Sequence, residues 1–389
     1  MHRLRPGDRR RRRAPLTPVR RAHAAVAVAF VCLGTADGTW AARLPAIKDR
    51  LGLDSGRLGL ALFAATLCST LTLPFAGMVA SRFGSRLPTA GGVAVISAGL
   101  ACAGLAPSYV TLLLAAGLFG VGIGMLDVSA NAHGVSVEQR LERPILSSLH
   151  GFWSIGLLAG SAVAAGAAAV AASTRLHFPL VAAALLLAGL AVVPQMLSGT
   201  RTVDAAHFAL PRGALALPAF LTFCSFFLES ASMSWTAVFL AGPAEASGAV
   251  AAGGVVAYSI AMAAARFAGD PLTARWGIGG IARRGGTLVV VGITLALVTR
   301  SPVPALLGFA IVGAGCAAIV PALFRAASAV PGISAGAGIA AVATAGYFGG
   351  VVNGPTIGFL ARGVGLTAAM SLIGVFGGLI ALLGPRLER

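Results

Sequence analysis

Ionisable side chains interrupt several long apolar stretches of this chain, and they are the first candidates for chemistry. Asp37, Asp127, His150 and Glu229 each lie in or beside such a stretch. Burying an ionised group at the centre of a lipid-exposed helix costs about 2.5–3.5 kcal/mol on insertion scales, so such groups usually face a cavity and mark a pathway. Carboxyl and imidazole groups in a cavity can bind a polar solute or exchange a proton. These four residues are therefore predicted to take part in substrate or proton binding.

Helical spacing places two of these residues beside neutral polar side chains. Asp127 and Asn131 are four residues apart and share one helix face, while Ser147, His150 and Ser154 share a face of the next helix. We expect the two faces to converge on one cavity. Structural roles remain open, because Asp127 could hold a hydrogen bond near the cytoplasmic end of its helix and a neutral His150 could tie its helix to a neighbour.

Aromatic and helix-breaking residues are further candidates. Trp40, Trp153 and Trp235 offer faces that suit the apolar side of a sugar ring, although an aromatic residue in a membrane helix more often serves in packing or as an interface anchor. The run Asn353-Gly354-Pro355 is expected to unwind or kink its helix and to free backbone carbonyl groups, which are tolerated where they line a cavity. A hinge is the favoured role for this run.

Composition indicates which elements must hold these residues. Hydrophobic residues make up 57% of the 389 residues and charged residues 11%, against roughly 25% charged residues in soluble domains; the mean hydropathy is +0.88. About 20 mainly apolar residues cross a bilayer as a helix. Twelve such stretches predict an all-α membrane protein, and they begin near Ala24, Leu58, Leu87, Tyr109, Ile145, Phe178, Ala214, Gly248, Gly286, Val303, Ile333 and Leu366.

Several motifs recur at half the length of the chain. Trp40 recurs as Trp235, Arg82-Phe83-Gly84 as Arg275-Trp276-Gly277, and Gly156 and Gly160 as Gly350 and Gly354. A membrane protein of two similar halves is most often a transporter, because the seam between the halves can open alternately to either side. We therefore expect two pseudo-symmetric six-helix bundles (23–197 and 213–384), a cytoplasmic linker (198–212), a basic cytoplasmic tail (1–22) and a C-terminal cytoplasmic tail (385–389).

Positive charge is distributed unevenly along the chain. The formal net charge is +17, and nine arginines lie in the first 21 residues. Placing both termini in the cytoplasm puts about 21 of the 29 Lys and Arg residues inside, as the positive-inside rule requires. The run Arg9–Arg13 is interpreted as part of a topology-setting tail, with contact to RNA or to anionic lipid headgroups as the sharper alternative. No nucleic-acid partner is expected.

The remaining charged residues and the cysteines are interpreted as structural. Arg266 and Arg325 are predicted near the cytoplasmic face, and Lys48, Arg50 and Asp54 are predicted to be solvated in the first external loop. The five cysteines lack the close pairing of a metal site, and the sequence offers no set of nucleophile, base and orienting group. Neither enzymatic activity nor a metal or cofactor is therefore expected.

Two loops resemble a known signature. The chain reads Gly77-Met-Val-Ala-Ser81-Arg82-Phe83-Gly84-Ser85-Arg86 after the second span and Gly269-Asp270-Pro-Leu-Thr-Ala-Arg275-Trp276-Gly277 after the eighth. Both resemble the cytoplasmic loop signature of the major facilitator superfamily, Gly-x-x-x-Asp-Arg-x-Gly-Arg. Ser81 stands where that family carries aspartate, and the second copy is one residue longer. The resemblance implies the major facilitator fold and a gating or structural role for Gly77, Arg82, Gly84, Arg86, Gly269, Asp270, Arg275 and Gly277.

A narrower resemblance concerns the fourth and fifth spans. Leu126-Asp127-Val-Ser-Ala-Asn131 and His150-Gly-Phe-Trp153-Ser154 are similar to the fucose-permease-like branch of bacterial facilitators. In that branch the acid of the fourth span belongs to the sugar and proton site, and the superfamily places spans 1, 5 and 7 along a central cavity. The resemblance thus implies that Trp40, Trp153 and Trp235 lie near this cavity, in the inner (plasma) membrane of a bacterial cell.

These observations together predict a secondary active transporter. It is expected to move a small solute by alternating access with protons as the coupling ion, to prefer a sugar-like substrate, and to work as a monomer in the lipid bilayer. A proton-driven drug or metabolite exporter is the first alternative, disfavoured because the fifth span lacks the Gly-Pro pair of the family's antiporters. A membrane sensor with the same fold is the second alternative, and it would bind a solute without flux.

Overall fold

The computed structural model describes residues 16–142, 145–198, 212–333 and 335–388, and every regular element among them is helical. The first half of the chain forms α1 (Leu16–Ala42), α2 (Leu44–Arg50), α3 (Ser55–Phe83), α4 (Arg86–Leu105), α5 (Tyr109–Leu141), α6 (Leu146–Ala169), α7 (Thr174–Val192) and η1 (Val193–Gln195). The second half forms η2 (Gly213–Leu215), α8 (Ala216–Ala241), α9 (Gly248–Thr299), α10 (Pro302–Cys316), α11 (Ile319–Ser328), α12 (Ala335–Val364), α13 (Leu366–Leu383) and η3 (Gly384–Glu388).

Eleven helical segments among the described residues are long and apolar enough to cross a membrane. They include α10 and α11 as one span, Pro302–Ser328, and two segments of α9, Gly248–Gly269 and Pro271–Thr299. Helix α12 supplies the remaining predicted span. It is 30 residues long but is not one of these eleven segments. The prediction of an all-α, multi-pass membrane protein is therefore confirmed.

Two span boundaries differ from the sequence prediction. Helix α1 begins at Leu16, inside the predicted tail 1–22, and the ninth span begins after the turn at Gly277 rather than near Gly286. In both places the helix extends past its apolar run, and Arg20 on α1 is exposed. Apolar runs mark only the part of a helix that faces hydrocarbon, because a helix satisfies its own backbone hydrogen bonds and can continue into water.

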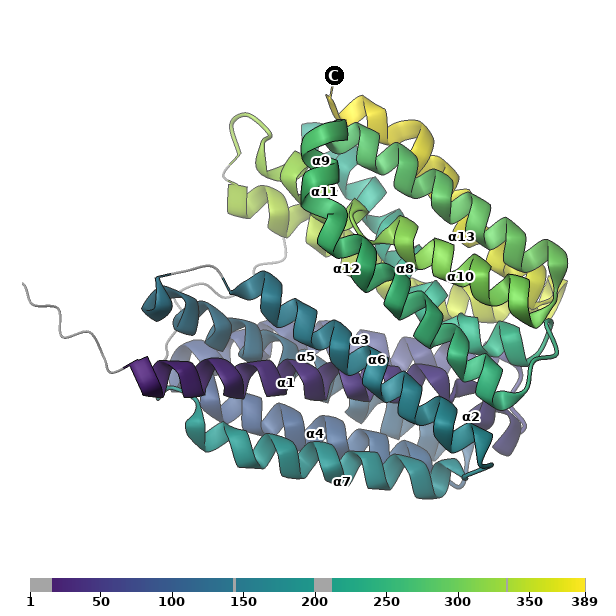
Figure 1. Cartoon of the computed structure of the whole chain (residues 1–389), viewed down its shortest axis with the longest axis horizontal. Helices are drawn as coiled ribbons and strands as arrows, with labels where there is room; N and C mark the ends of the chain where they lie inside the picture. The colour runs from purple at the N-terminus through teal and green to yellow at the C-terminus, as the bar shows by residue number, and fades with distance from the viewer. Residues whose placement is uncertain (1–15, 143–144, 199–211, 334, 389) are drawn as a thin grey trace, which may run out of the picture.

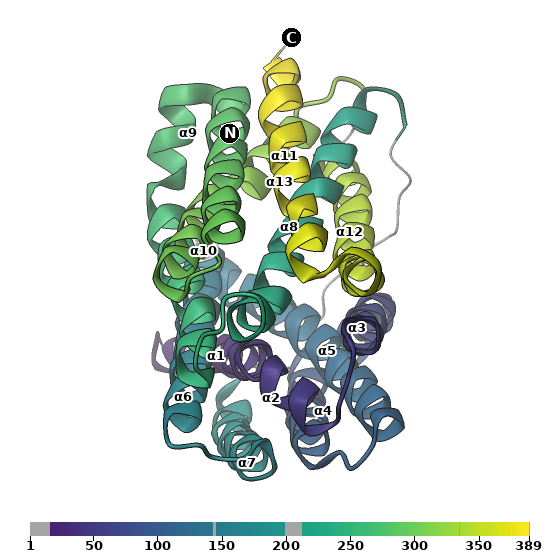
Figure 2. The same ribbon diagram turned by 90° about the vertical axis from the view of Figure 1, so that its right-hand side faces the viewer.

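The helices form two groups that follow the two halves of the chain. In the first half, α1 packs on α6, α4 on α5 and α7, and α3 on α5; in the second, α9 packs on α10 and α13, and α8 packs on α12. Figures 1 and 2 show the groups one above the other. The predicted linker lies almost wholly outside the described residues, which omit 199–211, so the bundle boundaries stay a prediction.

The two groups touch through small residues at the end opposite the chain termini. Near the start of α3, Gly59 lies against Gly354 of α12. A Cβ at Gly354 would lie 2.7 Å from the Gly59 carbonyl oxygen and 3.0 Å from the Leu62 Cβ, so this close approach requires a glycine. Arg362 forms an ion pair of 3.7 Å with Asp54 at the same end. Figure 1 shows the groups diverging toward the end where α1 begins.

A larger side chain at Gly354 should wedge this closed end apart. We expect Gly354→Leu to raise the population open at this end by about tenfold or more, because the added side chain has no space between α12 and α3. A cysteine replacing Ala168, which faces Gly248 where α6 meets α9, would report the opening through its labelling rate in a cysteine-free background. Gly363→Leu is the control, since a Cβ there meets nothing within 4 Å. Unchanged labelling of the Gly354 variant would show that this contact does not hold the end closed.

The repeated loop motif ends a helix in the same way in both halves. Gly84 has φ 83° and ψ 159°, and Gly277 has φ 69° and ψ 177°. Glycine enters this region freely, whereas other residues are strained there. Each glycine lets the chain turn from one span into the next. The recurrence seen in the sequence is therefore a recurrence of one backbone turn.

Replacing either glycine should destabilise the fold. We expect Gly277→Ala to cost about 1–3 kcal/mol, the usual strain of a side chain in this backbone region, and so to lower the melting temperature of the detergent-purified protein. Gly253→Ala, inside a helix where a Cβ meets nothing within 4 Å, should leave the melting temperature unchanged or raise it. Equal melting temperatures for the Gly277 variant and wild type would contradict the strain argument.

Candidate functional site

Helices α1 and α6 approach each other closely because glycines line their contact. A Cβ at Gly34 would lie 2.7 Å from the Leu157 backbone nitrogen, and one at Gly156 would also meet the backbone of α1. This packing places Asp37 opposite Trp153, whose indole Nε1 donates a hydrogen bond of 3.2 Å to the Asp37 Oδ2. Two predicted site residues on different helices of the first half are thus directly joined.

Arg266 extends this contact into the second half of the chain. Its guanidinium carbon lies 6.0 Å from the centre of the Trp153 ring, within the range of a cation–π interaction. Its Nη2 donates to the Glu229 Oε1 over 3.3 Å, and the Arg266 and Glu229 side chains are 34% and 24% exposed. Arg266 lies close to the end of the span Gly248–Gly269, and its place near the cytoplasmic face stays a prediction. Its partners Glu229 and Trp153 lie within the membrane spans and draw the guanidinium to the seam.

Asp127 and Asn131 meet on one face of α5, as their spacing predicts. The Asn131 Nδ2 donates to the Asp127 Oδ1 and to the Asp127 carbonyl oxygen, both over 2.9 Å. The Asp127 carboxyl group also lies within electrostatic range of Asp37 and of Tyr347 on α12. Asp127 therefore interacts through its charge with the acid of α1 and with a hydroxyl group from the other half.

Among the described residues, His150 forms no hydrogen bond with the carboxyl groups of Asp37 or Asp127. Its ring makes an edge-on contact with Phe30 of α1, with ring centres 5.3 Å apart, and lies within electrostatic range of Arg266. Ser154 donates to the His150 carbonyl oxygen over 3.2 Å. The Ser147 side chain, which was expected on the same face, lies outside the described residues. The contact with Phe30 supports the interpretation of His150 as a link between helices.

Three further predicted site residues are buried in the packing between helices. Trp40 is buried and stacks on Phe119, with ring centres 5.1 Å apart. Trp235 is fully buried, and its indole Nε1 has no partner within the described residues. Asn353 is buried and donates to the Gly350 carbonyl oxygen. These placements favour packing over ligand contact for all three.

The expected unwinding at Asn353-Gly354-Pro355 does not occur. Helix α12 remains helical from Ala335 to Val364, with Pro355 inside it. Gly354 packs against α3 at this point, and such tertiary contact can hold a helix together around a proline, because neighbouring helices compensate the lost hydrogen bond. The run therefore contributes a close contact between the halves rather than free carbonyl groups.

The loop-motif residues lie at the turns between spans. Gly77 is buried, while Arg82 is exposed and lies 5.5 Å from the centre of the Phe83 ring. Arg86 begins α4, whereas Gly269 and Arg275 are within α9, and the two motif glycines Gly84 and Gly277 make the turns described above. The Asp270 side chain lies outside the described residues. A gating role for this motif stays a prediction.

Arg50 of the first external loop is bound rather than solvated, whereas Asp54 is exposed. Arg50 donates to the Thr174 Oγ1 over 2.7 Å and to the carbonyl oxygens of Ala103 and Ala106, which joins the ends of α4 and α7. Asp54 caps α3 by accepting from the Arg57 backbone nitrogen over 2.8 Å. This hydrogen bond, with a smaller contribution from Arg362, lowers the pKa of the Asp54 carboxyl group. Carbonyl groups left unpaired at helix ends explain the binding of Arg50.

Sequence reasoning missed two further polar residues. Tyr347 follows a glycine-rich run that gives no sign of a site. His133 is buried in α5, where its Nδ1 pairs with the Ser85 hydroxyl group at 2.9 Å and its Nε2 accepts from the Leu197 backbone nitrogen at 3.2 Å. His133 therefore joins α5 to the start of α4 and to the segment after η1. The sequence offered one indication of a role for His133, its position on α5 two residues after Asn131.

Comparison with known proteins identifies relatives along most of the chain. A family model described as Major Facilitator Superfamily matches residues 26–352. The chain is 31% identical over 381 residues to the uncharacterized transporter y4wD of Sinorhizobium fredii (strain NBRC 101917 / NGR234), covering 96% of this chain and 99% of that protein. It is 28% identical over 371 residues to the membrane protein MosC of Rhizobium meliloti, covering 94% and 90%.

Solved structures share the fold at low sequence identity. A mutant form of the nucleoside transporter NupG matches with a TM-score of 0.76 and 13% identity, covering 94% of this chain and 98% of that chain. A bacterial homolog to the human lysosomal transporter Spinster, in an inward-facing and occupied conformation, matches with a TM-score of 0.72 and 16% identity, covering 94% and 96%. The narrower resemblance to fucose permeases is not tested by these matches.

Proposed function

Because the chain belongs to the Major Facilitator Superfamily of membrane transporters, we propose that it moves a small polar solute by alternating access coupled to protons. The observation that carries this proposal is the polar network across the seam. Asp37 and Trp153 of the first half meet Arg266 and Glu229 of the second through the hydrogen bond, the cation–π contact and the ion pair described above. A solute or proton that alters one of these contacts would alter how the halves meet.

Coupling to protons follows from the acids of this network. Asp37 and Asp127 lie within electrostatic range of each other, so a proton on one carboxyl group changes the interactions of the other. A solute that binds one protonation state more tightly must, by reciprocity, change proton affinity by the same factor. The site therefore has the groups that linked binding of a proton and a solute requires.

The chemistry of the site favours a hydroxylated solute. Asp127, Asn131 and Tyr347 offer hydrogen-bond acceptors and donors, and the Trp153 ring offers an aromatic face next to Asp37. Hydroxyl groups pair with the first set, and the apolar face of a sugar-like ring suits the second. We propose a sugar-like or polyol substrate on this basis.

The contacts between the halves suggest which state the structure represents. They close the end opposite the chain termini. With both termini in the cytoplasm, as charge distribution predicts, this is an inward-facing conformation in the bacterial plasma membrane. Opening of the Gly59–Gly354 contact would then accompany the change to the outward-facing state.

Proton movement in proteoliposomes tests the proposal. The full chain would be reconstituted with a pH-sensitive dye inside, and a panel of sugars, polyols, organic acids and cationic drugs would be added to wild type and Asp127→Asn. We expect proton flux with a hydroxylated solute, and its loss in the variant. Asp49→Asn, a change at an exposed external residue, is the matched control.

The other outcomes separate the alternatives. Proton flux driven only by cationic drugs would contradict the proposed sugar-like substrate and would support the exporter. Solute binding without any flux would favour the sensor. Flux that survives Asp127→Asn would remove Asp127 from coupling and direct attention to Asp37 and Glu229.

A further inference from the structure

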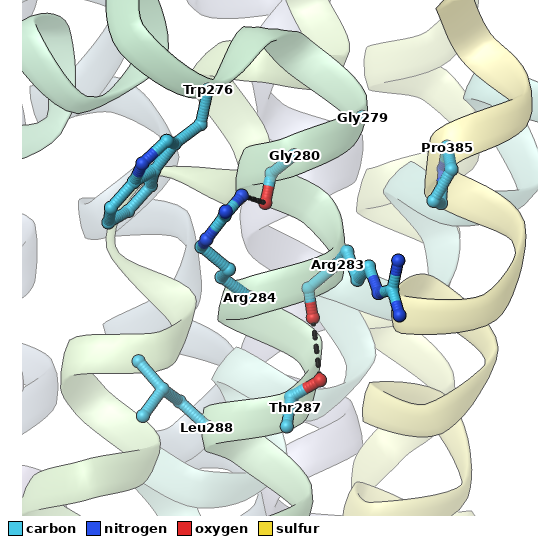
Figure 3. Close-up of a pocket in the computed structure, with 8 residues that line it drawn as sticks. All are labelled: Trp276, Gly279, Gly280, Arg283, Arg284, Thr287, Leu288 and Pro385. Atoms are coloured by element: carbon cyan, nitrogen blue, oxygen red, sulfur yellow. Dashed lines mark hydrogen bonds between the residues drawn. The ribbon is translucent and has the colours of Figure 1, made fainter.

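A separate pocket lies at the end of the molecule that carries the chain termini. It has a volume of about 660 Å³ and lies where the second part of α9 meets η3 (Figure 3). Its walls come from Trp276, Gly279, Gly280, Arg283, Arg284, Thr287, Leu288 and Pro385. Helix η3 is held there because Gly384 packs directly on Ala282. The pocket shares no residue with the polar network at the seam.

Among the residues that the structure describes, two arginines and no acid line this pocket. The Arg284 guanidinium carbon lies 4.3 Å from the centre of the Trp276 ring, and its Nη1 donates to the Gly280 carbonyl oxygen over 3.3 Å. In Figure 3, Arg283 points from the same helix toward Pro385. Both arginine residues are exposed. Their charge therefore remains available for an anionic group.

Gly280 keeps this arrangement open. A Cβ there would lie 3.0 Å from the Trp276 Cβ and 3.1 Å from the Arg284 Nη1. Any side chain at this position would press on both the indole and the guanidinium group. The absence of a side chain at residue 280 thus permits the stacked pair of Trp276 and Arg284.

An apolar stripe continues from the pocket along α9. Arg284, Leu288, Val291 and Val298 follow the spacing of one helix face, and the three apolar residues are 42%, 52% and 75% exposed. In a membrane-spanning helix such a face contacts lipid chains, while tryptophan and arginine lie at the level of the headgroups. The geometry of the stripe matches an acyl chain running from a headgroup held in the pocket.

We propose that this pocket binds the headgroup of an anionic phospholipid from the leaflet on the side of the chain termini. The phosphate would pair with Arg283 and Arg284, and one acyl chain would lie along Leu288 and Val291. Basic pockets between membrane helices bind anionic headgroups in this way. The apolar stripe favours a lipid over a free phosphate, because a free phosphate gains nothing from it.

Quenching of tryptophan fluorescence tests the proposal on the full-length protein. Of the four tryptophans, Trp40 and Trp235 are buried and Trp153 lies at the seam, so Trp276 is the one beside the proposed site. The protein would be placed in phosphatidylcholine vesicles containing a minor fraction of brominated phosphatidylglycerol or of brominated phosphatidylcholine. We expect wild type to prefer phosphatidylglycerol by about tenfold or more, since each of the two arginines near an anionic surface contributes roughly fivefold.

The variants decide whether the pocket causes this preference. Arg283→Gln combined with Arg284→Gln should quench equally with both lipids, whereas Arg300→Gln, at the opposite end of α9, should behave as wild type. Replacing both arginines by lysine should restore most of the preference, because the charge returns. Equal quenching by the two lipids in wild type, or a preference that survives the glutamine changes, would overturn the proposal. Equal quenching by both lipids, together with a change in Trp276 fluorescence on adding inorganic phosphate that is lost in the glutamine variant, would assign the pocket to a soluble anion.

Discussion

Arg266→Gln is expected to reduce solute-driven proton flux by at least about tenfold while the protein still folds. The change leaves Glu229 without its cation and removes the charge that faces Trp153 across the seam. Breaking a fully buried pair from one side costs about 3–5 kcal/mol, but these side chains are 34% and 24% exposed. Solvent screening therefore reduces the expected cost to about 1–2 kcal/mol. Initial rates in proteoliposomes, compared at equal protein content, measure the effect.

A double-mutant cycle identifies the origin of that loss. If the ion pair is responsible, Glu229→Gln combined with Arg266→Gln should be no worse than Arg266→Gln alone, because the uncompensated acid is gone. Arg300→Gln, which removes an exposed arginine at the far end of the same helix, should leave flux unchanged. Strictly additive losses would show that the two residues act independently.

Trp153→Phe is expected to move the pH midpoint of transport upward and to lower the maximal flux by about tenfold. The phenylalanine ring can still face Arg266 but cannot donate to Asp37, whose carboxylate accepts from the indole Nε1 over 3.2 Å. A hydrogen bond to a charged group contributes about 1.5–3 kcal/mol, and it favours the ionised form of its acceptor. Without it, the proton is retained to a higher pH. Flux measured across a pH series gives both the midpoint and the maximum.

Trp235 provides the matched control for this change. Trp235→Phe removes an indole N–H that has no partner among the described residues, so the pH midpoint should not move. Trp153→Ala should lose the ring contact with Arg266 as well and show a lower flux than Trp153→Phe. An equal shift of the pH midpoint in Trp153→Phe and Trp235→Phe would assign the effect to packing rather than to the hydrogen bond with Asp37.

The fold was largely predictable because the membrane restricts what a sequence can form. Apolar runs, repeated motifs and the loop signature around Gly84 and Gly277 led to a multi-pass helical transporter fold, and the family match agrees. Positions of helix ends were less predictable, as the starts of α1 and the ninth span show. Hydropathy indicates which residues tolerate the hydrocarbon layer. A helix ends where its backbone hydrogen-bond pattern ends, and that point can lie in water.

The candidate site was predictable only in part. The pairing of Asp127 with Asn131 depends on spacing along one helix, and the structure contains it. Trp40, Trp235 and Asn353 had the same polar or aromatic character as Trp153, yet the packing of their helices buries them. The contacts of Arg266 could not be predicted from local spacing, because its partners come from α6 and α8.

The sequence by itself determined the membrane location, the helical class, the twofold repeat and the residue types available for binding, because each depends on composition or on local periodicity. Only the tertiary structure decided which of those residues meet. Asp37 reaches Trp153 because glycines let α1 and α6 approach, and Trp153 reaches Arg266 because the two halves join along one seam. These distances depend on the angle and closeness of helix packing, and residues far apart in a sequence do not encode them in any local pattern.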